Sequence, residues 1–358
     1  MARPSQLRID VDALIHNASI TRQLAGAQKV MAAVKAEAYG HGAVACARVL
    51  MPHVDAFSVA FVEEAVILRA AGINIPILVL DGPFDADDVQ NIIDLNLWTV
   101  VHSFNQIDFL GSAKPTRLPA IWLKLDTGMH RLGFTPQEFG QALAALRTIG
   151  ASDITLMSHL AAAETTENPL TQRQLQRWHE AVSIFDGPSS LGNSAALINA
   201  TAQDNQWIRP GYMLYGGMPG GIGEALTLKP VMSFESRVMS VREISTGETV
   251  GYGGRWCAQR DSRIATVPVG YADGYPRHAI DGTPVAVNGQ LAALAGRVSM
   301  DMLTIDITDL VNVRIGDPVT LWGDTPSLDV VAAHADTIGY ELTSRISNRV
   351  PRVFDGDY

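Results

Sequence analysis

Basic, hydroxyl and amide-bearing residues recur directly after short apolar segments in the first 230 residues of the chain. A lysine can form an imine with an aldehyde cofactor, arginines pair with phosphate and carboxylate groups, and Ser/Gly segments can cradle a phosphate. The residues concerned are Lys35, Asp126, Met129, Arg131, His159, Asn193, Ser194, Arg209, Gly211 and Tyr212. If they share one cavity, they suit an anionic cofactor that is bound through an imine to a lysine.

The elements that would position these residues alternate between short apolar segments and segments with helical periodicity. Strands are predicted at residues 30–34, 56–59, 75–80, 98–101, 121–125, 154–157, 189–191 and 207–209. Helices are predicted between them, at residues 43–50, 62–71, 85–95, 104–110, 136–146, 169–185 and 195–201. This α/β alternation is typical of a (β/α)8 barrel, whose active site lies at the carboxyl ends of the strands. The residues named above would then all face one end of the barrel.

The pattern changes after about residue 230. Short strand candidates separated by Gly, Pro and Asp follow, at residues 234–241, 264–269, 284–287, 302–307 and 318–321, and one helix is predicted at 330–338. This spacing favours a mainly-β domain. The predicted organisation is therefore a barrel domain at residues 1–232 and a C-terminal mainly-β domain at 233–358.

Composition excludes several classes of function. The formal net charge of -10 and the lack of a basic run argue against a nucleic-acid partner. The two cysteines, Cys46 and Cys257, predict neither a disulfide framework nor a thiolate metal site, and no other set of residues has metal-ligand spacing. The start of the chain is not a secretory signal, and no apolar stretch reaches the ~20 residues that span a bilayer. We expect a cytoplasmic protein without a metal or a membrane partner.

Each candidate residue also has an ordinary structural interpretation. Lys35 could extend its amine from the strand end to solvent, and His159 could be a buried core histidine. Ser194 could cap the helix that follows it, and Arg209 could pair with a surface acid. Residue types and spacing alone leave these interpretations open.

Seven motifs, ordered across both predicted domains, resemble those of the alanine racemase family, and the resemblance runs from residue 10 to residue 352. In the barrel they are VKA with AYGHG (34–42), LDTGMHRLG (125–133), SHLA (158–161), NSAA (193–196) and RPG (209–211). In the second domain they are VGYADGYPR (269–277) and GRVSMD (296–301). The resemblance implies pyridoxal 5'-phosphate (PLP) as cofactor and the interconversion of L- and D-alanine as the reaction.

The resemblance also implies two acid/base groups. Lys35 would bind PLP and act on one face of the substrate α-carbon, and Tyr271 would act on the opposite face. In the family this tyrosine comes from the second domain of a partner subunit, so a head-to-tail homodimer with shared active sites is expected. Two groups on opposite faces allow a proton to leave one face and return to the other.

The remaining site residues follow from the same resemblance. Arg209 would face the pyridine nitrogen of PLP and His159 would pack near the ring, while the phosphate would be held by a group of residues near the strand ends. That group comprises Tyr39, Ser194, Gly211 and the backbone of Tyr212, and Asn193 is also expected among the cofactor-binding residues. Arg131 and Met300 would contact the substrate carboxylate, Met300 from the partner subunit.

Two positions need separate treatment. Several members of the family carry a carbamylated lysine at the position of Lys124, and the resemblance implies that such a group positions Arg131. Many relatives have a substrate-side tyrosine where this chain has Asn348. We expect the polar, smaller Asn348 side chain to admit serine better than a tyrosine would.

Three alternative functions fit the sequence less well. A basic amino-acid decarboxylase on the same architecture would need an acidic partner for the pyridine nitrogen, and a non-catalytic PLP carrier would have no use for Tyr271. The glycines at residues 216–223 lack the spacing and the strand–helix frame of a dinucleotide site. The sequence predicts an alanine racemase that supplies D-alanine for peptidoglycan, with a broader or serine-preferring racemase as the alternative.

Overall fold

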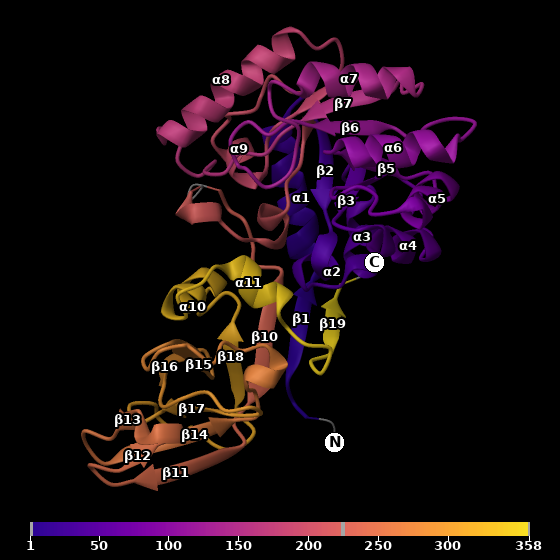
Figure 1. The fold of residues 1–358 in the computed structure, drawn as a ribbon. Coiled ribbons are helices and arrows are strands. Elements are labelled where there is room, and N and C mark those ends of the chain that lie inside the picture. Colours follow the sequence, from indigo (N-terminus) through magenta and orange to yellow (C-terminus); the bar gives the residue numbers. More distant parts are fainter. Residues whose placement is uncertain (1–2, 223–225, 357–358) are drawn as a thin grey trace.

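A barrel domain is joined to a β-rich domain in the computed structural model, which describes residues 3–222 and 226–356 (Figure 1). Eight parallel strands close the barrel, which confirms the predicted fold class. They are β2 (Lys29–Ala33), β3 (Ala56–Val59), β4 (Ile77–Val79), β5 (Trp98–Val101), β6 (Ile121–Lys124), β7 (Ile154–Met157), β8 (Ser189–Ser190) and β9 (Trp207–Ile208). Most of these strands are buried on both faces, which explains why their segments are continuously apolar.

Helices surround the barrel. They are α1 (Val11–Ala25), α2 (Lys35–Tyr39), α3 (Ala43–Leu50), α4 (Val62–Ala70), α5 (Ala86–Asp94), α6 (Phe104–Ala113), α7 (Phe139–Thr148), α8 (Pro169–Ser183) and α9 (Ser194–Ile198). The α7 helix starts three residues later than predicted, because Thr135 and Glu138 form a hydrogen-bonded turn before it. The sequence analysis did not identify α1, whose N-cap Asp10 accepts a hydrogen bond from the Ala13 N–H at 2.8 Å.

Large side chains fill the inside of the barrel. One buried cluster takes residues from most of the strands, among them Trp122 and Trp207, and the partly buried Trp98 packs against it. The ring of Trp207 lies 5.5 Å from that of Trp98 and 5.7 Å from that of Trp122, both edge to face. Because the barrel is packed solid here, a ligand site must lie at one of its ends.

The second domain is built on a nine-stranded sheet with the order β11-β14-β17-β16-β15-β18-β10-β1-β19. Its strands are β10 (Met232–Arg237), β11 (Ser240–Ile244), β14 (Ser262–Val267), β15 (Pro284–Val287), β16 (Gln290–Leu294), β17 (Leu303–Asp306), β18 (Pro318–Trp322) and β19 (Arg352–Asp355), with β1 as described below. A small ribbon pairs β12 (Thr249–Val250) with β13 (Trp256–Cys257). The single strand predicted at 234–241 is two strands, β10 and β11. The division between residues 232 and 233 stays a prediction.

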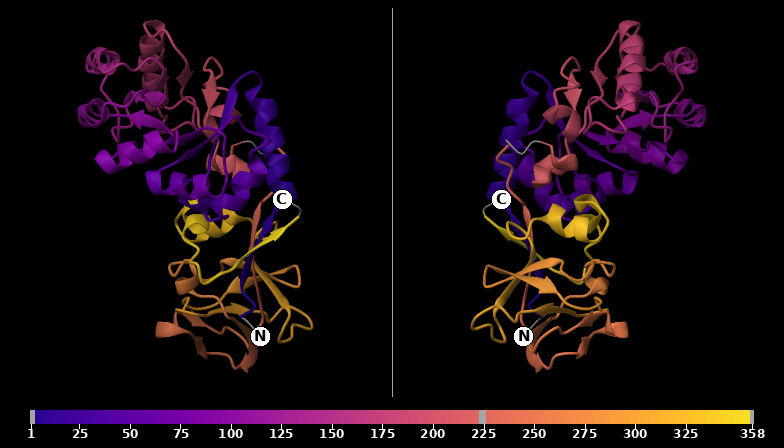
Figure 2. Two further views of the ribbon diagram at one scale, coloured as in Figure 1. Left: turned by 90° about the vertical axis from the view of Figure 1, so that its right-hand side faces the viewer. Right: turned by 90° about the vertical axis from the view of Figure 1, so that its left-hand side faces the viewer.

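Two short helices, α10 (Leu328–His334) and α11 (Gly339–Ser344), lie between the barrel and the sheet (Figure 2). They take the place of the one helix predicted at 330–338. Two 3-10 helices, Tyr212–Tyr215 and Pro219–Gly221, precede the second domain. Of the glycine-rich segment 216–223, Gly223 lies outside the described residues.

The first strand, β1 (Gln6–Asp10), belongs to the sheet of the second domain although it opens the chain. It pairs antiparallel with β10 and parallel with β19. The sequence analysis missed this strand, because only a contact across more than 200 residues reveals it. Within the described residues, no helix combines the length and the apolar character needed to cross a membrane.

Candidate active site

Lys35 lies just beyond the end of β2, before a left-handed turn. Residues 36–39 have φ angles between 50° and 56°, so α2 is not a right-handed helix. For residues with a Cβ this conformation costs roughly 1–2 kcal/mol each. Burial lowers the pKa of Lys35, the nearby Asp81 carboxylate opposes that change, and the Arg131 guanidinium adds to it. At neutral pH, the fraction of the side chain present as the free amine is therefore larger for Lys35 than for an exposed lysine.

Several cationic side chains meet at the carboxyl end of the barrel strands. The charges of Arg131 and Arg209 lower the pKa of both Lys35 and Lys124, and the charge of Lys35 also lowers the pKa of Lys124. The carboxylate of Asp81, which follows β4, offsets part of their charge. Such a surplus of positive charge favours a ligand that carries phosphate or carboxylate groups.

Arg209 directly follows β9 and its side chain is only 7 % exposed. Its guanidinium donates to the Ser190 hydroxyl at 2.5 Å and to the Ser158 carbonyl at 2.7 Å. Burial lowers the pKa of Arg209 to about 10, so the group still carries its charge at neutral pH. The surface ion pair considered from the sequence is therefore not formed, and Arg209 is a fixed cation inside the barrel end.

His159 is neutral. Burial lowers its pKa well below the ordinary value, and the nearby cations Arg209 and Arg131 add to that effect. The Nη2 atom of Arg209 lies 3.5 Å from Nδ1 of His159. Because a guanidinium can only donate, Nδ1 accepts and carries no proton. The imidazole is thus an uncharged, flat group beside the arginine, suited to pack on an aromatic ring.

Residues that the resemblance assigns to a phosphate cradle lie together where β8 and β9 end. The Ser194 hydroxyl accepts hydrogen bonds from the Gly211 N–H at 3.0 Å and the Met213 N–H at 3.4 Å. A Cβ at position 211 would overlap with the hydroxyl of Tyr39, so glycine is required for this close approach. The hydroxyls of Tyr39 and Ser194 and the backbone at Gly211, from three segments distant in the chain, therefore converge at this point.

The helix cap next to this cradle differs from the one considered in the sequence analysis. Asn193, and not Ser194, is the N-cap of α9, and its side chain accepts from the Ala196 N–H at 3.0 Å. This leaves the Ser194 hydroxyl free to face Gly211. Asn193 itself supports the cradle through the start of the helix.

Tyr212 connects the cradle to the second domain. Its hydroxyl donates to Asp329 at 2.7 Å, and its ring stacks on that of Tyr340 with a centroid distance of 3.8 Å. Asp329 and Tyr340 belong to α10 and α11. Tyr212 therefore links this end of the barrel to two helices of the same chain.

Tyr271 and Met300 lie together on the second domain, away from the Lys35 group. The Tyr271 N–H donates to the Ser299 carbonyl, and the Ala272 N–H to the Met300 carbonyl, both at 3.0 Å. Both side chains are exposed in the single chain, Tyr271 by 39 % and Met300 by 54 %. Tyr271 borders a depression of about 290 Å³ on the second domain that does not include Lys35.

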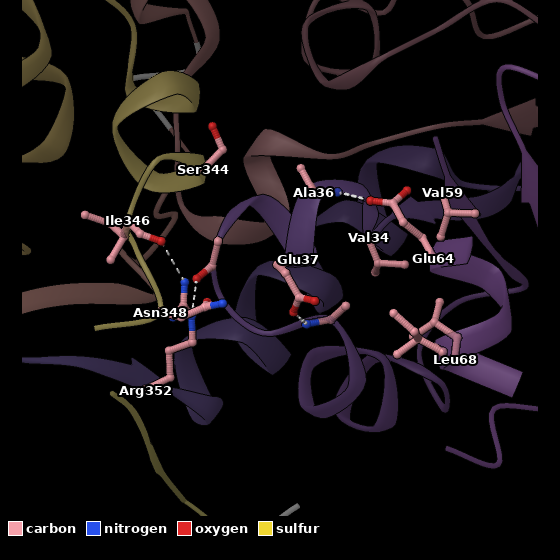
Figure 3. A pocket seen from close by; sticks show the side chains of 13 residues that line it. Val34, Ala36, Glu37, Val59, Glu64, Leu68, Ser344, Ile346, Asn348 and Arg352 are labelled. Carbon is pink, nitrogen blue, oxygen red and sulfur yellow. Dashed lines mark hydrogen bonds between the residues drawn. The ribbon is translucent and has the colours of Figure 1, made fainter. Parts of the chain in front are cut away.

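Asn348 lines a different cavity of about 290 Å³, beside the left-handed turn (Figure 3). The walls include Val34 and Ala36 from the barrel and Ile346 and Arg352 from the second domain. Arg131 instead borders a small recess with Lys124, Asp126, Met129 and His159. The structure therefore brings the barrel residues together, whereas Lys35, Arg131 and His159 do not line the cavity that contains Asn348.

The sequence analysis did not identify Asp81 or Glu64, and it placed His41 in a motif without giving it a role. Asp81 follows a predicted barrel strand as Lys35 and His159 do, so that position rule could have found it. Glu64 contacts the Lys35 turn only through a backbone N–H, as described below, and no sequence pattern signals such a contact.

Lys124, at the end of β6, is a buried lysine with a strongly lowered pKa. Burial, together with the cations Arg131 and Arg209, lowers its pKa to about 8. At neutral pH an appreciable fraction of this side chain is therefore the free amine. That is the form that reacts with carbon dioxide to give a carbamate.

We predict that Lys124 makes stability depend on pH in a defined direction. Between its folded pKa of about 8 and its ordinary value of 10.5, the unfolded chain binds a proton that the folded chain has released. Stability should therefore rise with pH across this window, by roughly 3 kcal/mol in total at Lys124. Below pH 8 the full penalty is present, so Lys124→Met should be more stable than wild type there.

Urea unfolding of the cofactor-free protein in carbon-dioxide-free buffer, at pH values from 7 to about 10.5, measures this difference. The exposed Lys114→Met serves as the matched control and should follow wild type. A constant offset between wild type and Lys124→Met at all pH values would contradict the assignment.

Comparison with known proteins agrees with this geometry. Residues 9–219 match the family described as alanine racemase, N-terminal domain, and residues 231–354 match alanine racemase, C-terminal domain. An alanine racemase of Chromohalobacter salexigens is 48% identical over 98% of this chain and 98% of its own. A catabolic alanine racemase of Pseudomonas aeruginosa is 44% identical over 99% of both chains. The crystal structure of the biosynthetic alanine racemase of the same species superposes with a TM-score of 0.96 at 43% identity, covering 99% of this chain and 100% of the other.

Proposed function

The chain belongs to the alanine racemase family, and from that premise we propose that it interconverts L- and D-alanine with PLP, using Lys35 and Tyr271 as acid/base groups. One observation carries the proposal. A lysine with a lowered pKa, a buried arginine and a phosphate-type cradle meet at the same end of the barrel. This combination has the three features that a lysine-bound phosphate cofactor needs.

PLP, when bound, withdraws electrons from the α-carbon of the amino acid joined to it and so acidifies the α-proton. The chain's own residues then decide where that proton goes. Lys35, with a lowered pKa, removes or returns a proton on one face. Tyr271 does the same on the opposite face, so that the configuration inverts.

The placement of Tyr271 supports a homodimer with shared sites. In the single chain its phenol is exposed on the second domain, with Met300 beside it. An apolar and an aromatic side chain held out on one short turn suit insertion into another subunit's barrel end. We propose that each site takes Lys35 and Arg131 from one subunit and Tyr271 and Met300 from the other.

Arg209 sets the electronic character of the site. A buried guanidinium that keeps its charge disfavours a proton on a ring nitrogen facing it. The cofactor is then a weaker electron sink than it is beside a carboxylate. We expect this to limit side reactions such as transamination, and it speaks against the decarboxylase considered from the sequence.

Lys124 is proposed to act as a carbamate. Its free amine is available near neutral pH, and the new negative charge would lie among Arg131, Arg209 and Lys35. The charge would pair with Arg131 and hold that guanidinium toward the substrate carboxylate. The modification would also remove the repulsion between Lys124 and its cationic neighbours.

Alanine is the preferred substrate in this proposal, since the relatives described above are named alanine racemases; a serine preference is not favoured. We propose further that the reaction takes place in the cytoplasm and that the D-alanine serves peptidoglycan synthesis. Deletion of the gene should then make growth of the host depend on added D-alanine, unless it has a second racemase.

Two measurements on the purified protein test the proposed reaction. An absorbance spectrum with and without borohydride, followed by peptide mass analysis, should locate reduced PLP on Lys35. A racemisation assay with L-alanine and L-serine should show the higher kcat/KM for alanine. The absence of a borohydride-fixed cofactor, or the absence of racemisation of either amino acid, would contradict the proposal.

A further inference from the structure

The left-handed turn after Lys35 is held by groups outside it. Four residues with Cβ atoms keep a conformation that isolated residues of these types avoid. Such a backbone persists only where its surroundings determine it, and it is found preferentially at functional sites. The contacts that hold the turn are therefore candidates for positioning roles.

The carboxylate of Glu64 holds the first peptide of the turn (Figure 3). Its Oε1 accepts from the Ala36 N–H at 2.6 Å. Its Oε2 accepts from the Ala60 N–H at 2.6 Å and from the Phe61 N–H at 3.3 Å. One side chain on α4 thus joins the end of β3 to the peptide bond that directly follows Lys35.

Other groups hold the far end of the turn. His41 donates from Nδ1 to the carbonyls of Ala38 and Tyr39, at 2.9 and 3.0 Å, and burial lowers its pKa to about 4, so the ring is neutral. The Nε atom of Arg352 donates to the Gly40 carbonyl at 2.8 Å. These contacts are three or more residues from Lys35.

We propose that Glu64 is a positioning residue that directs the Lys35 side chain into the barrel end by fixing the Ala36 amide; this rests on the proposed role of Lys35. A change in the φ and ψ angles next to this peptide reorients Lys35 at its Cα, and the amine, about 6 Å away at the end of the side chain, moves further than the backbone does. A displacement of about 1 Å at a reacting atom can cost about 10²-fold in rate. A contact one peptide bond away from Lys35 therefore has a large effect on its reactivity.

The competing explanation is that Glu64 acts only through its charge, which stabilises the protonated amine of Lys35. Two variants separate position from charge. Glu64→Asp keeps the charge but lacks the length to bridge both strand ends. Glu64→Gln keeps the length but loses the charge and one acceptor, because an amide nitrogen cannot accept. The exposed neighbour Glu63 on the same helix supplies the matched control, Glu63→Gln.

The experiment follows attachment of PLP to the cofactor-free protein by absorbance, with borohydride fixation and peptide mass analysis at Lys35. Rates are expressed per site that binds pyridoxine 5'-phosphate, which fills the phosphate cradle but has no aldehyde. Misfolded protein, which binds no pyridoxine 5'-phosphate, is therefore excluded from the measured rate. Hydrogen exchange of the peptide covering residues 34–41 reports on the turn without any cofactor.

We expect both Glu64→Asp and Glu64→Gln to slow attachment by on the order of tenfold, the effect of losing a charge-assisted hydrogen bond, and to speed exchange in the turn. Affinity for pyridoxine 5'-phosphate should stay within about twofold, and Glu63→Gln should match wild type on all measures. A wild-type rate in Glu64→Asp would show that charge alone acts and would overturn the proposal. A Glu64 variant that binds no pyridoxine 5'-phosphate would also overturn the proposal, because the cradle is expected to form without Glu64.

The two proposals fail in different ways. If the wild-type protein attaches no PLP at Lys35, the proposed function is wrong. If the wild type attaches PLP and both Glu64 variants do so equally fast, only the role of Glu64 is wrong.

Discussion

Replacing Lys35 by alanine is expected to lower the rate of alanine racemisation by about 10⁴-fold or more, because one side chain supplies both the cofactor attachment and one acid/base group. The phosphate cradle of Tyr39, Ser194 and Gly211 should remain. Pyridoxine 5'-phosphate should therefore still bind, while borohydride should fix no PLP. Both are measured on the same preparation by binding titration and absorbance.

The control for this substitution is Lys29→Ala, which removes an exposed lysine at the start of the same strand. It should keep wild-type activity within about twofold. If Lys35→Ala retained a tenth or more of the wild-type kcat, another amine would have to hold the cofactor. Lys124, with its pKa of about 8, would then be the first alternative.

The second large effect concerns Tyr271 and is expected to depend on how subunits are combined. Tyr271→Phe alone should lower racemisation by about 10²- to 10⁴-fold, because one face of the α-carbon loses its proton donor and acceptor. The variant should still exchange the α-proton of one alanine enantiomer with deuterium from the solvent, through Lys35. Mass spectrometry of each enantiomer after incubation in D₂O measures this asymmetry.

Mixed dimers test whether the tyrosine comes from the partner. Subunits carrying Lys35→Ala and subunits carrying Tyr271→Phe, labelled with different tags and purified as hybrids, should form one intact site and one doubly defective site. The hybrid should then regain about half of the wild-type activity, although each parent is nearly inactive. A hybrid as inactive as its parents would mean that Tyr271 acts within its own chain, and the shared-site proposal would be wrong.

Local patterns in the sequence were sufficient to predict the barrel. Strands and helices of a barrel repeat in order along the chain, and strands buried on both faces are continuously apolar, so each unit is visible in a short window. The rule that function lies at the carboxyl ends of the strands then placed Lys35, His159 and Arg209 at one end. In the structure these residues follow β2, β7 and β9, and the charges of Arg209 and Lys35 both lower the pKa of His159.

The same rule led to residues whose detailed roles only the fold revealed. Asn193 and Ser194 are adjacent and both are good capping residues. Only the hydrogen bonds to Ala196 and Gly211 decide that the first caps α9 and the second faces the cradle.

Amino-acid order by itself thus determined the barrel, the mainly-β domain and the residues that gather at the barrel end, because these depend on local periodicity and on motifs. Tertiary structure decided where β1 pairs, how residues 36–39 turn after Lys35 and which carboxylate holds them. Ala, Glu and Tyr have no preference for a left-handed turn, so no local signal could predict it. Its conformation is held by the neighbouring His41 and by Glu64 and Arg352, which approach from distant parts of the chain only when it has folded.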